Sequence, residues 1–68
     1  MNKPTYSLPS PNEPRGNIFN IIGEVTQLLK RNNQKKLADE LVHRIITQHQ
    51  ARNYGEAIKI IKEYVNVI

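Results

Sequence analysis

The stretch LADELVHRIITQH, residues 37–49, decides the fold because its apolar side chains recur at helical spacing. They follow an i, i+1, i+4, i+5 pattern: Leu37, Ala38, Leu41, Val42, Ile45 and Ile46, with His49 in the same register. On a helix of 3.6 residues per turn, such positions share one face. The pattern predicts an amphipathic helix over residues 34–49.

A second helix is predicted upstream, over residues 18–31. Its apolar stripe is expected to include Phe19, Ile22 and Leu29. Asn17 is expected to be the N-cap, because its side-chain oxygen can accept a first-turn N–H. Asn32 is expected to end the helix in the left-handed conformation.

A third helix is predicted over residues 54–65. Asn53 followed by Glu56 is close to a capping box, and apolar residues then recur every three or four positions. Only residues 65–68 have a β-like pattern. Because the connections between the predicted helices are short, neighbouring helices are expected to be antiparallel.

The first sixteen residues, MNKPTYSLPSPNEPRG, contain all four prolines of the chain. Proline breaks helices, and the few apolar residues cannot offset the entropy of ordering the segment. We therefore predict a disordered tail over residues 1–16 and a three-helix domain over residues 17–68. The alternative is a docking peptide anchored by Tyr6 and Leu8. The expected fold class is all-α, a small three-helix bundle with a disordered N-terminal tail.

The composition favours a cytosolic protein without catalytic chemistry. The chain has no cysteine, no apolar run long enough to cross a membrane, and no apolar stretch typical of a signal peptide. Its six carboxylates form no evident acid–base pair, and His43 and His49 do not share a helix face. We expect no enzyme activity, metal, cofactor or small-molecule substrate, and no membrane association.

A basic cluster brackets the turn between the first two predicted helices, and the net charge is +4. It consists of Lys30, Arg31, Lys35 and Lys36. Lys35 and Lys36 fall in the first turn of a helix, where the helix dipole disfavours cations. This conflict indicates either a tip that contacts the phosphates of a nucleic acid or a solvated turn. The possible auxiliary cations are Arg52, Lys59 and Lys62.

Two apolar residues, Ile60 and Val67, fall off the main stripe of the third helix. They mark either a partner surface or scattered surface residues, which are common. A 68-residue chain is near the lower size limit for a self-sufficient core. We therefore expect a protein-interaction module or a small homo-oligomer, with a nucleic-acid-binding accessory factor as the alternative.

The run Asn-Ile-Phe-Asn-Ile-Ile-Gly at residues 17–23 is followed by Val25, by Leu-Lys-Arg at 29–31, by Tyr-Gly-Glu-Ala-Ile at 54–58 and by Tyr-Val-Asn-Val at 64–67. This pattern resembles a group of short uncharacterised bacterial proteins, often encoded by phages, plasmids or other mobile elements. The resemblance implies a small helical protein. It implies no activity and no catalytic residues.

Overall fold

A computed structural model describes residues 3–49 and 51–68 of the chain. Within them the fold is mostly helical, with a two-stranded parallel sheet added, so the prediction of a purely all-α fold is wrong in this respect. The elements in chain order are β1 (Thr5–Tyr6), a 3₁₀ turn (Pro14–Gly16), α1 (Ile18–Arg31), α2 (Lys35–Val42), a π-helical turn (His43–Thr47), α3 (Tyr54–Ile61) and β2 (Asn66–Val67).

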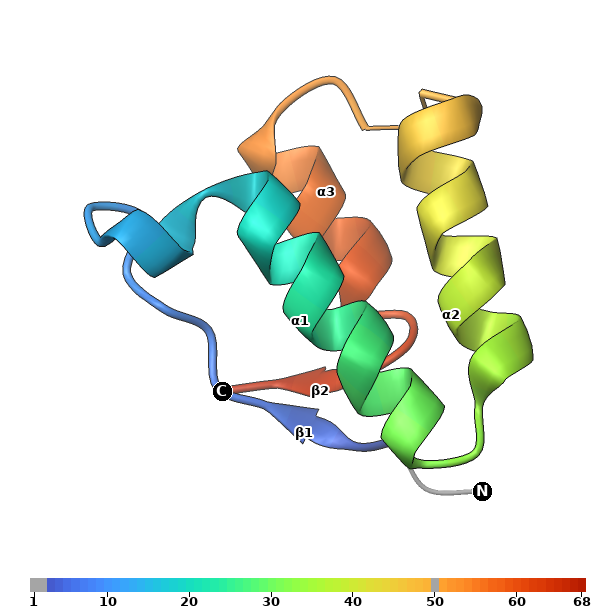
Figure 1. The fold of residues 1–68 in the computed structure, drawn as a ribbon. Helices are drawn as coiled ribbons and strands as arrows, with labels where there is room; N and C mark the ends of the chain where they lie inside the picture. Colours follow the sequence, from blue (N-terminus) through green and yellow to red (C-terminus); the bar gives the residue numbers. More distant parts are fainter. Residues whose placement is uncertain (1–2, 50) are drawn as a thin grey trace.

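The three helices pack around one core (Figure 1). α2 lies beside α1, and α3 lies behind α1 in this view. The largest fully buried side chains come from all three helices and from the segment that follows α3: Ile21, Val25, Leu29, Leu41, Ile61 and Val65. The predicted helix periodicity therefore gives most of the core correctly.

The predicted bounds of the first helix, 18–31, are confirmed. Asn17 is the N-cap, and its Oδ1 accepts a hydrogen bond from the Phe19 backbone N–H at 2.8 Å. At the other end the prediction is displaced by one residue. Asn32 keeps a negative φ of −97°, and Asn33 takes the left-handed conformation with a φ of 60°. Asparagine tolerates this conformation better than most residues, and here it reverses the chain into α2.

The predicted helix over 34–49 is a shorter α-helix followed by a π-helical turn. The Gln48 N–H donates to the His43 carbonyl at 2.9 Å, an i to i+5 bond. His49, with a φ of 51°, ends the helical path. π-helical turns are frequent at functional sites. This one borders the groove described below.

The third helix ends at Ile61, four residues earlier than predicted. The Glu63 and Tyr64 N–H groups bond to the carbonyls of Ile60 and Ile61, which tightens the chain into a turn. β2 follows, within the stretch whose pattern is β-like. Its pairing with β1 supplies backbone hydrogen bonds that a continued helix would otherwise provide.

The prediction of a disordered tail is wrong for residues 3–8. β1 pairs with β2 in parallel, with Thr5 opposite Asn66 and Tyr6 opposite Val67. Tyr6 is only 7% exposed and belongs to the core. Ordering this segment costs conformational entropy, and its composition suggested too little apolar burial to offset that cost. The buried ring of Tyr6 and the backbone hydrogen bonds of the strand pair provide the offset. The first two residues of the predicted tail lie outside the described residues.

Candidate binding surfaces

An apolar groove of about 350 Å³ lies where the start of α1 meets the π-helical turn and the start of α3. Its apolar wall is formed chiefly by Ile18, Phe19, Ile45, Ile46, Ala51 and Tyr54. Two stretches that are distant in sequence thus meet at this end of the molecule: the start of α1, and the part of the chain that runs from the π-helical turn to the start of α3. We call this feature the Phe19 groove.

Two of the groove residues are large, apolar and exposed. Among the described residues, the exposed large hydrophobic side chains are Phe19 (70% exposed), Ile46 (42%) and Ile68 (76%), and the first two line the groove. The prediction that Phe19 lies on the core stripe is wrong. At about 100° per residue, Phe19 lies about 160° around the helix from Ile21 and about 120° from Val25, the residues that α1 buries most deeply.

The polar rim of the groove carries cationic or neutral groups. His49, Arg52 and Asn53 line it, and no carboxylate of the described residues does. Arg52 is exposed, and its backbone N–H donates a hydrogen bond to the Glu56 carboxylate at 2.8 Å. The groove therefore combines apolar walls with a rim that favours negative charge.

A buried polar atom also lies in the groove wall. The Tyr54 hydroxyl has no hydrogen-bond partner among the described residues. A buried hydroxyl without a partner costs free energy relative to one that is hydrogen-bonded. Because this hydroxyl is shielded from solvent, and so from the groove, the cost falls on the fold itself.

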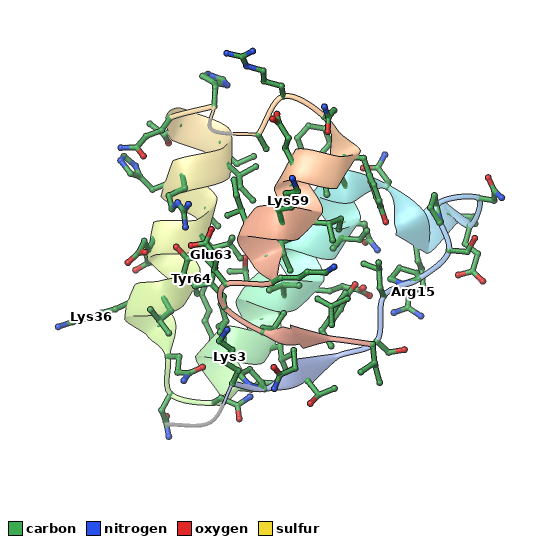
Figure 2. The ribbon with its side chains drawn as sticks, turned by 180° about the vertical axis from the view of Figure 1, so that it is seen from behind. Lys3, Arg15, Lys36, Lys59, Glu63 and Tyr64 are labelled. Atoms are coloured by element: carbon green, nitrogen blue, oxygen red, sulfur yellow. The ribbon has the colours of Figure 1, made fainter. Side chains whose placement is uncertain are left out.

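The predicted basic cluster lies at the opposite end of the helices, at the turn between α1 and α2. Lys30, Arg31, Lys35 and Lys36 are all exposed. The fold brings Lys3 to the same end, where its Nζ donates to the Lys62 carbonyl at 3.3 Å (Figure 2). We call these five residues the basic end.

Four cations of the basic end have no carboxylate partner in the described part of the chain, whereas the charge of Lys3 acts on Glu63 and helps Arg44 to lower the pKa of that carboxyl. The ion pairs in that part of the chain are Arg15 with Glu24 and Arg44 with Glu63, and neither includes a residue of the basic end. α2 begins at Lys35 without a side-chain cap and without an acidic residue in its first turn. The conflict between cations and helix dipole that the sequence indicates is therefore present in the fold.

The predicted partner surface of Ile60 and Val67 is wrong. Ile60 is only 7% exposed and belongs to the core, while Val67 is half-buried in β2 and packs against that core. α3 is buried over a wider arc than a single stripe, with Ile58, Ile60 and Ile61 all in the core cluster. The extra arc exists because the fold includes the strand pair that the predicted bundle lacks.

A polar network ties α2 to the turn that follows α3. The Tyr64 hydroxyl donates to Glu40 Oε1 at 2.6 Å and accepts from Arg44 Nη1 at 3.0 Å, and Arg44 also pairs with Glu63 at 3.0 Å. Burial and the bond to Glu40 raise the pKa of the Tyr64 hydroxyl, while Arg44 lowers the pKa of the Glu63 carboxyl. Figure 2 shows Glu63 and Tyr64 close together. The network joins α2 and the π-helical turn to the turn that follows α3.

No protein-family model, no curated protein and no solved structure matches this chain. The resemblance to short bacterial proteins of mobile elements therefore stays a prediction. The groove and the basic end are the features from which a function can be argued.

Two further features concern metals and membranes. Within residues 3–49 and 51–68, no group of three or more His, Cys, Asp or Glu side chains is placed to hold a metal ion. In the same ranges, no helix is both long and apolar enough to cross a membrane.

Sequence reasoning found the basic end and missed the Phe19 groove. Lysine and arginine are mostly exposed in proteins, so the place of a basic cluster on the surface follows from sequence alone. The groove needs two stretches that are distant in sequence, and only the helical angle of Phe19 relative to Ile21 and Val25 signalled that one of its residues is exposed.

Proposed function

We propose that this chain is a non-catalytic protein-interaction module that holds the apolar face of a partner helix in the Phe19 groove. The observation that carries this proposal is that Phe19 and Ile46, both large and exposed, line one groove. Scattered single apolar residues on a surface need no explanation, whereas apolar residues gathered in a hollow with a polar rim are typical of interaction sites.

The charge of the rim selects the partner. His49 and Arg52 face a groove that no carboxylate of the described residues lines, so an apolar helix flanked by Asp or Glu is complementary to it. An amphipathic helix that lies in an apolar groove is a common mode of peptide recognition.

A second copy of the chain is the less favourable occupant. In a symmetric dimer through this groove the two Arg52 side chains would approach each other, and each copy carries a net charge of +4. Like charges brought together at an interface disfavour association. We therefore propose an acidic partner over the homo-oligomer.

The experiment uses a synthetic acidic amphipathic helix of about four turns, with leucines at i, i+3, i+4 and i+7 and glutamates beside them. Titration into the labelled protein, followed by NMR, is expected to shift signals of the groove residues. Phe19→Ser is expected to weaken binding at least about tenfold, as for a buried aromatic anchor. Ile68→Ser is the matched control, because Ile68 is equally exposed and does not line the groove.

Three results would overturn this proposal. The peptide does not bind, or it binds with shifts away from the groove, or a version with lysine in place of glutamate binds as tightly. Sedimentation of the protein alone gives a further check: a dimer that Phe19→Ser dissociates would make a second copy the occupant. Since Phe19 is 70% exposed, its replacement is expected to leave the fold intact, which thermal melting checks.

We further propose that the module works in the cytosol without a metal or cofactor. Support comes from the sequence, which has no cysteine, and from the marginal size of the domain, which leaves little room to enclose a substrate.

A further inference from the structure

We infer that the basic end is a second binding surface, which contacts the phosphate backbone of a duplex nucleic acid. It is separate from the Phe19 groove. Figure 1 shows the turn between α1 and α2 at one end of the molecule and the loop between α2 and α3, which borders the groove, at the other. The inference therefore goes beyond the proposed protein interaction and does not depend on it.

The charge of the basic end is concentrated, and all of its cations except Lys3, which acts on the Glu63 carboxylate, have no carboxylate partner among the described residues. Five cations come from three segments: Lys3 beside β1, Lys30 and Arg31 at the end of α1, and Lys35 and Lys36 at the start of α2. None of the five forms an ion pair with a described residue. Several lysine or arginine side chains on one small surface are the footprint of phosphate contacts, which supply most of the affinity in non-specific nucleic-acid binding.

Of the described carboxylates, Glu63 offsets part of the charge of Lys3, and none forms an ion pair with Lys30, Arg31, Lys35 or Lys36. Glu24 and Glu63 are each paired with an arginine outside the basic end, and Glu40 accepts the Tyr64 hydroxyl. Asp39 and Glu40 follow one helical turn beyond Lys35 and Lys36, and neither forms an ion pair with them.

The position of Lys35 and Lys36 adds a reason for binding. Both lysines stand in the first turn of α2, where a positive charge opposes the helix dipole. That turn has no acidic side chain and no side-chain cap to relieve the conflict. Phosphates placed here would neutralise both the cations and the helix end. The fold is therefore arranged so that this end is more favourable with an anion than without one.

The chemistry of the surrounding residues favours a duplex over a membrane or a single strand. None of the exposed large hydrophobic residues belongs to residues 30–36, and an anchor at a membrane surface needs such residues. The tip is formed by Asn32 and Asn33, and no aromatic residue in residues 30–36 offers a platform for unpaired bases. Backbone phosphates of a duplex need neither feature.

The experiment measures fluorescence anisotropy of a labelled duplex DNA of mixed sequence, with the full chain, at several salt concentrations. If four phosphates are contacted, the association constant is expected to fall roughly 100-fold between about 50 and 200 mM salt. The double variant Lys35→Gln with Lys36→Gln is expected to bind at least about tenfold more weakly at the lower salt, with a log–log salt slope smaller by about two.

The matched control is Arg52→Gln with Lys59→Gln. It removes the same formal charge from two exposed positions, one in the loop before α3 and one on α3. The structure places Arg52 at the groove and Lys59 along α3, away from the basic end, so this inference does not give them the auxiliary role that the sequence allowed. The DNA affinity of the control is therefore expected to stay within about twofold of that of the unchanged chain. Both double variants replace exposed side chains, so both are expected to fold.

Several outcomes would overturn the inference: no binding to the duplex at low salt, an equal loss of affinity in the two double variants, or binding to vesicles of anionic phospholipid but not to the duplex. Phe19→Ser separates this inference from the proposed protein interaction. It is expected to bind the duplex as the unchanged chain does, even where it loses the acidic peptide.

Discussion

The Tyr6 hydroxyl donates a hydrogen bond to Glu24 Oε1 at 2.6 Å and so ties β1 to the middle of α1. The same carboxylate accepts from Arg15, whose Nη2 lies 3.1 Å from Oε2. Burial first, and then the bond to Glu24, raises the pKa of the Tyr6 hydroxyl. The bond from Tyr6, followed by that from Arg15, lowers the pKa of the Glu24 carboxyl. One carboxylate therefore holds the N-terminal strand and the turn before α1 in place.

Substitution of Tyr6 tests whether the N-terminal strand contributes to stability. Tyr6→Ala is expected to lower the free energy of unfolding by about 3–5 kcal/mol, because a core aromatic side chain is lost. Tyr6→Phe is expected to cost about 1–3 kcal/mol, since it removes only the bond to a charged acceptor. Urea unfolding followed by circular dichroism measures both. If both variants unfold at the urea concentration of the unchanged chain, the strand is not anchored as the structure shows.

The acid sensitivity of the fold provides a second prediction. Because the pKa of Glu24 is lower in the folded chain, its contribution to stability is fully present above its unfolded pKa, about 4.3, and is lost as the pH falls through the lower folded pKa. The unchanged chain is therefore expected to lose stability between about pH 5 and pH 3. Glu24→Gln has no titrating group at this position, so its stability is expected to fall less over that interval. Urea unfolding at pH 7, 5, 4 and 3 gives the two curves, and parallel curves would contradict the assignment.

Helix periodicity and capping were enough to predict α1, because both act over a few residues. Asn17 caps its own first turn, and the apolar spacing of Ile18 to Leu29 repeats locally. The strand pair left a weaker signal: a β-like pattern over residues 65–68, which include β2, and none over β1. Thr5 and Asn66 lie at opposite ends of the sequence, and each strand is only two residues long, so its pairing follows from the packed helices and not from its own pattern.

The same distinction explains what could be predicted of the candidate sites. Lys35 and Lys36 are exposed because a charged side chain is rarely buried, whatever the fold. Ile60 was misplaced because its burial depends on elements outside its helix. Phe19 and Ile46 line one groove only because the start of α1 lies near the π-helical turn. This arrangement belongs to the tertiary structure, and no local sequence pattern predicts it.

Two glycines provide a matched pair for a third prediction. A Cβ on Gly16 would overlap the Ser10 carbonyl oxygen and lie 2.8 Å from Pro11 Cα, both backbone atoms that cannot move aside cheaply. Gly16→Ala is therefore expected to destabilise the fold by about 1–3 kcal/mol, as overpacking does. A Cβ on Gly23 meets nothing within 4 Å, so Gly23→Ala in the middle of α1 is expected to stabilise by about 1 kcal/mol.

Thermal melting of the two alanine variants gives the comparison directly. The expected result is a lower melting temperature for the change at Gly16 and a higher one for the change at Gly23. Equal melting temperatures would mean that the loop at Ser10 and Pro11 does not pack on the turn before α1 as closely as the structure places it.

The network around Tyr64 yields a prediction that separates a buried hydrogen bond from an exposed ion pair. The Tyr64 residue is 5% exposed, whereas the Glu63 side chain is 57% exposed. Tyr64→Phe removes the bonds to Glu40 and Arg44, and it is expected to lower the free energy of unfolding by about 1–3 kcal/mol. Glu63→Gln removes an exposed ion pair with Arg44, which water and salt already screen, and is expected to change stability very little.

Urea unfolding at low and at high salt distinguishes the buried hydrogen bond from the exposed ion pair: the loss of stability in Tyr64→Phe should persist at high salt. If Glu63→Gln instead costs as much as Tyr64→Phe, then the ion pair, and not the buried hydroxyl, holds α2 to the turn that follows α3.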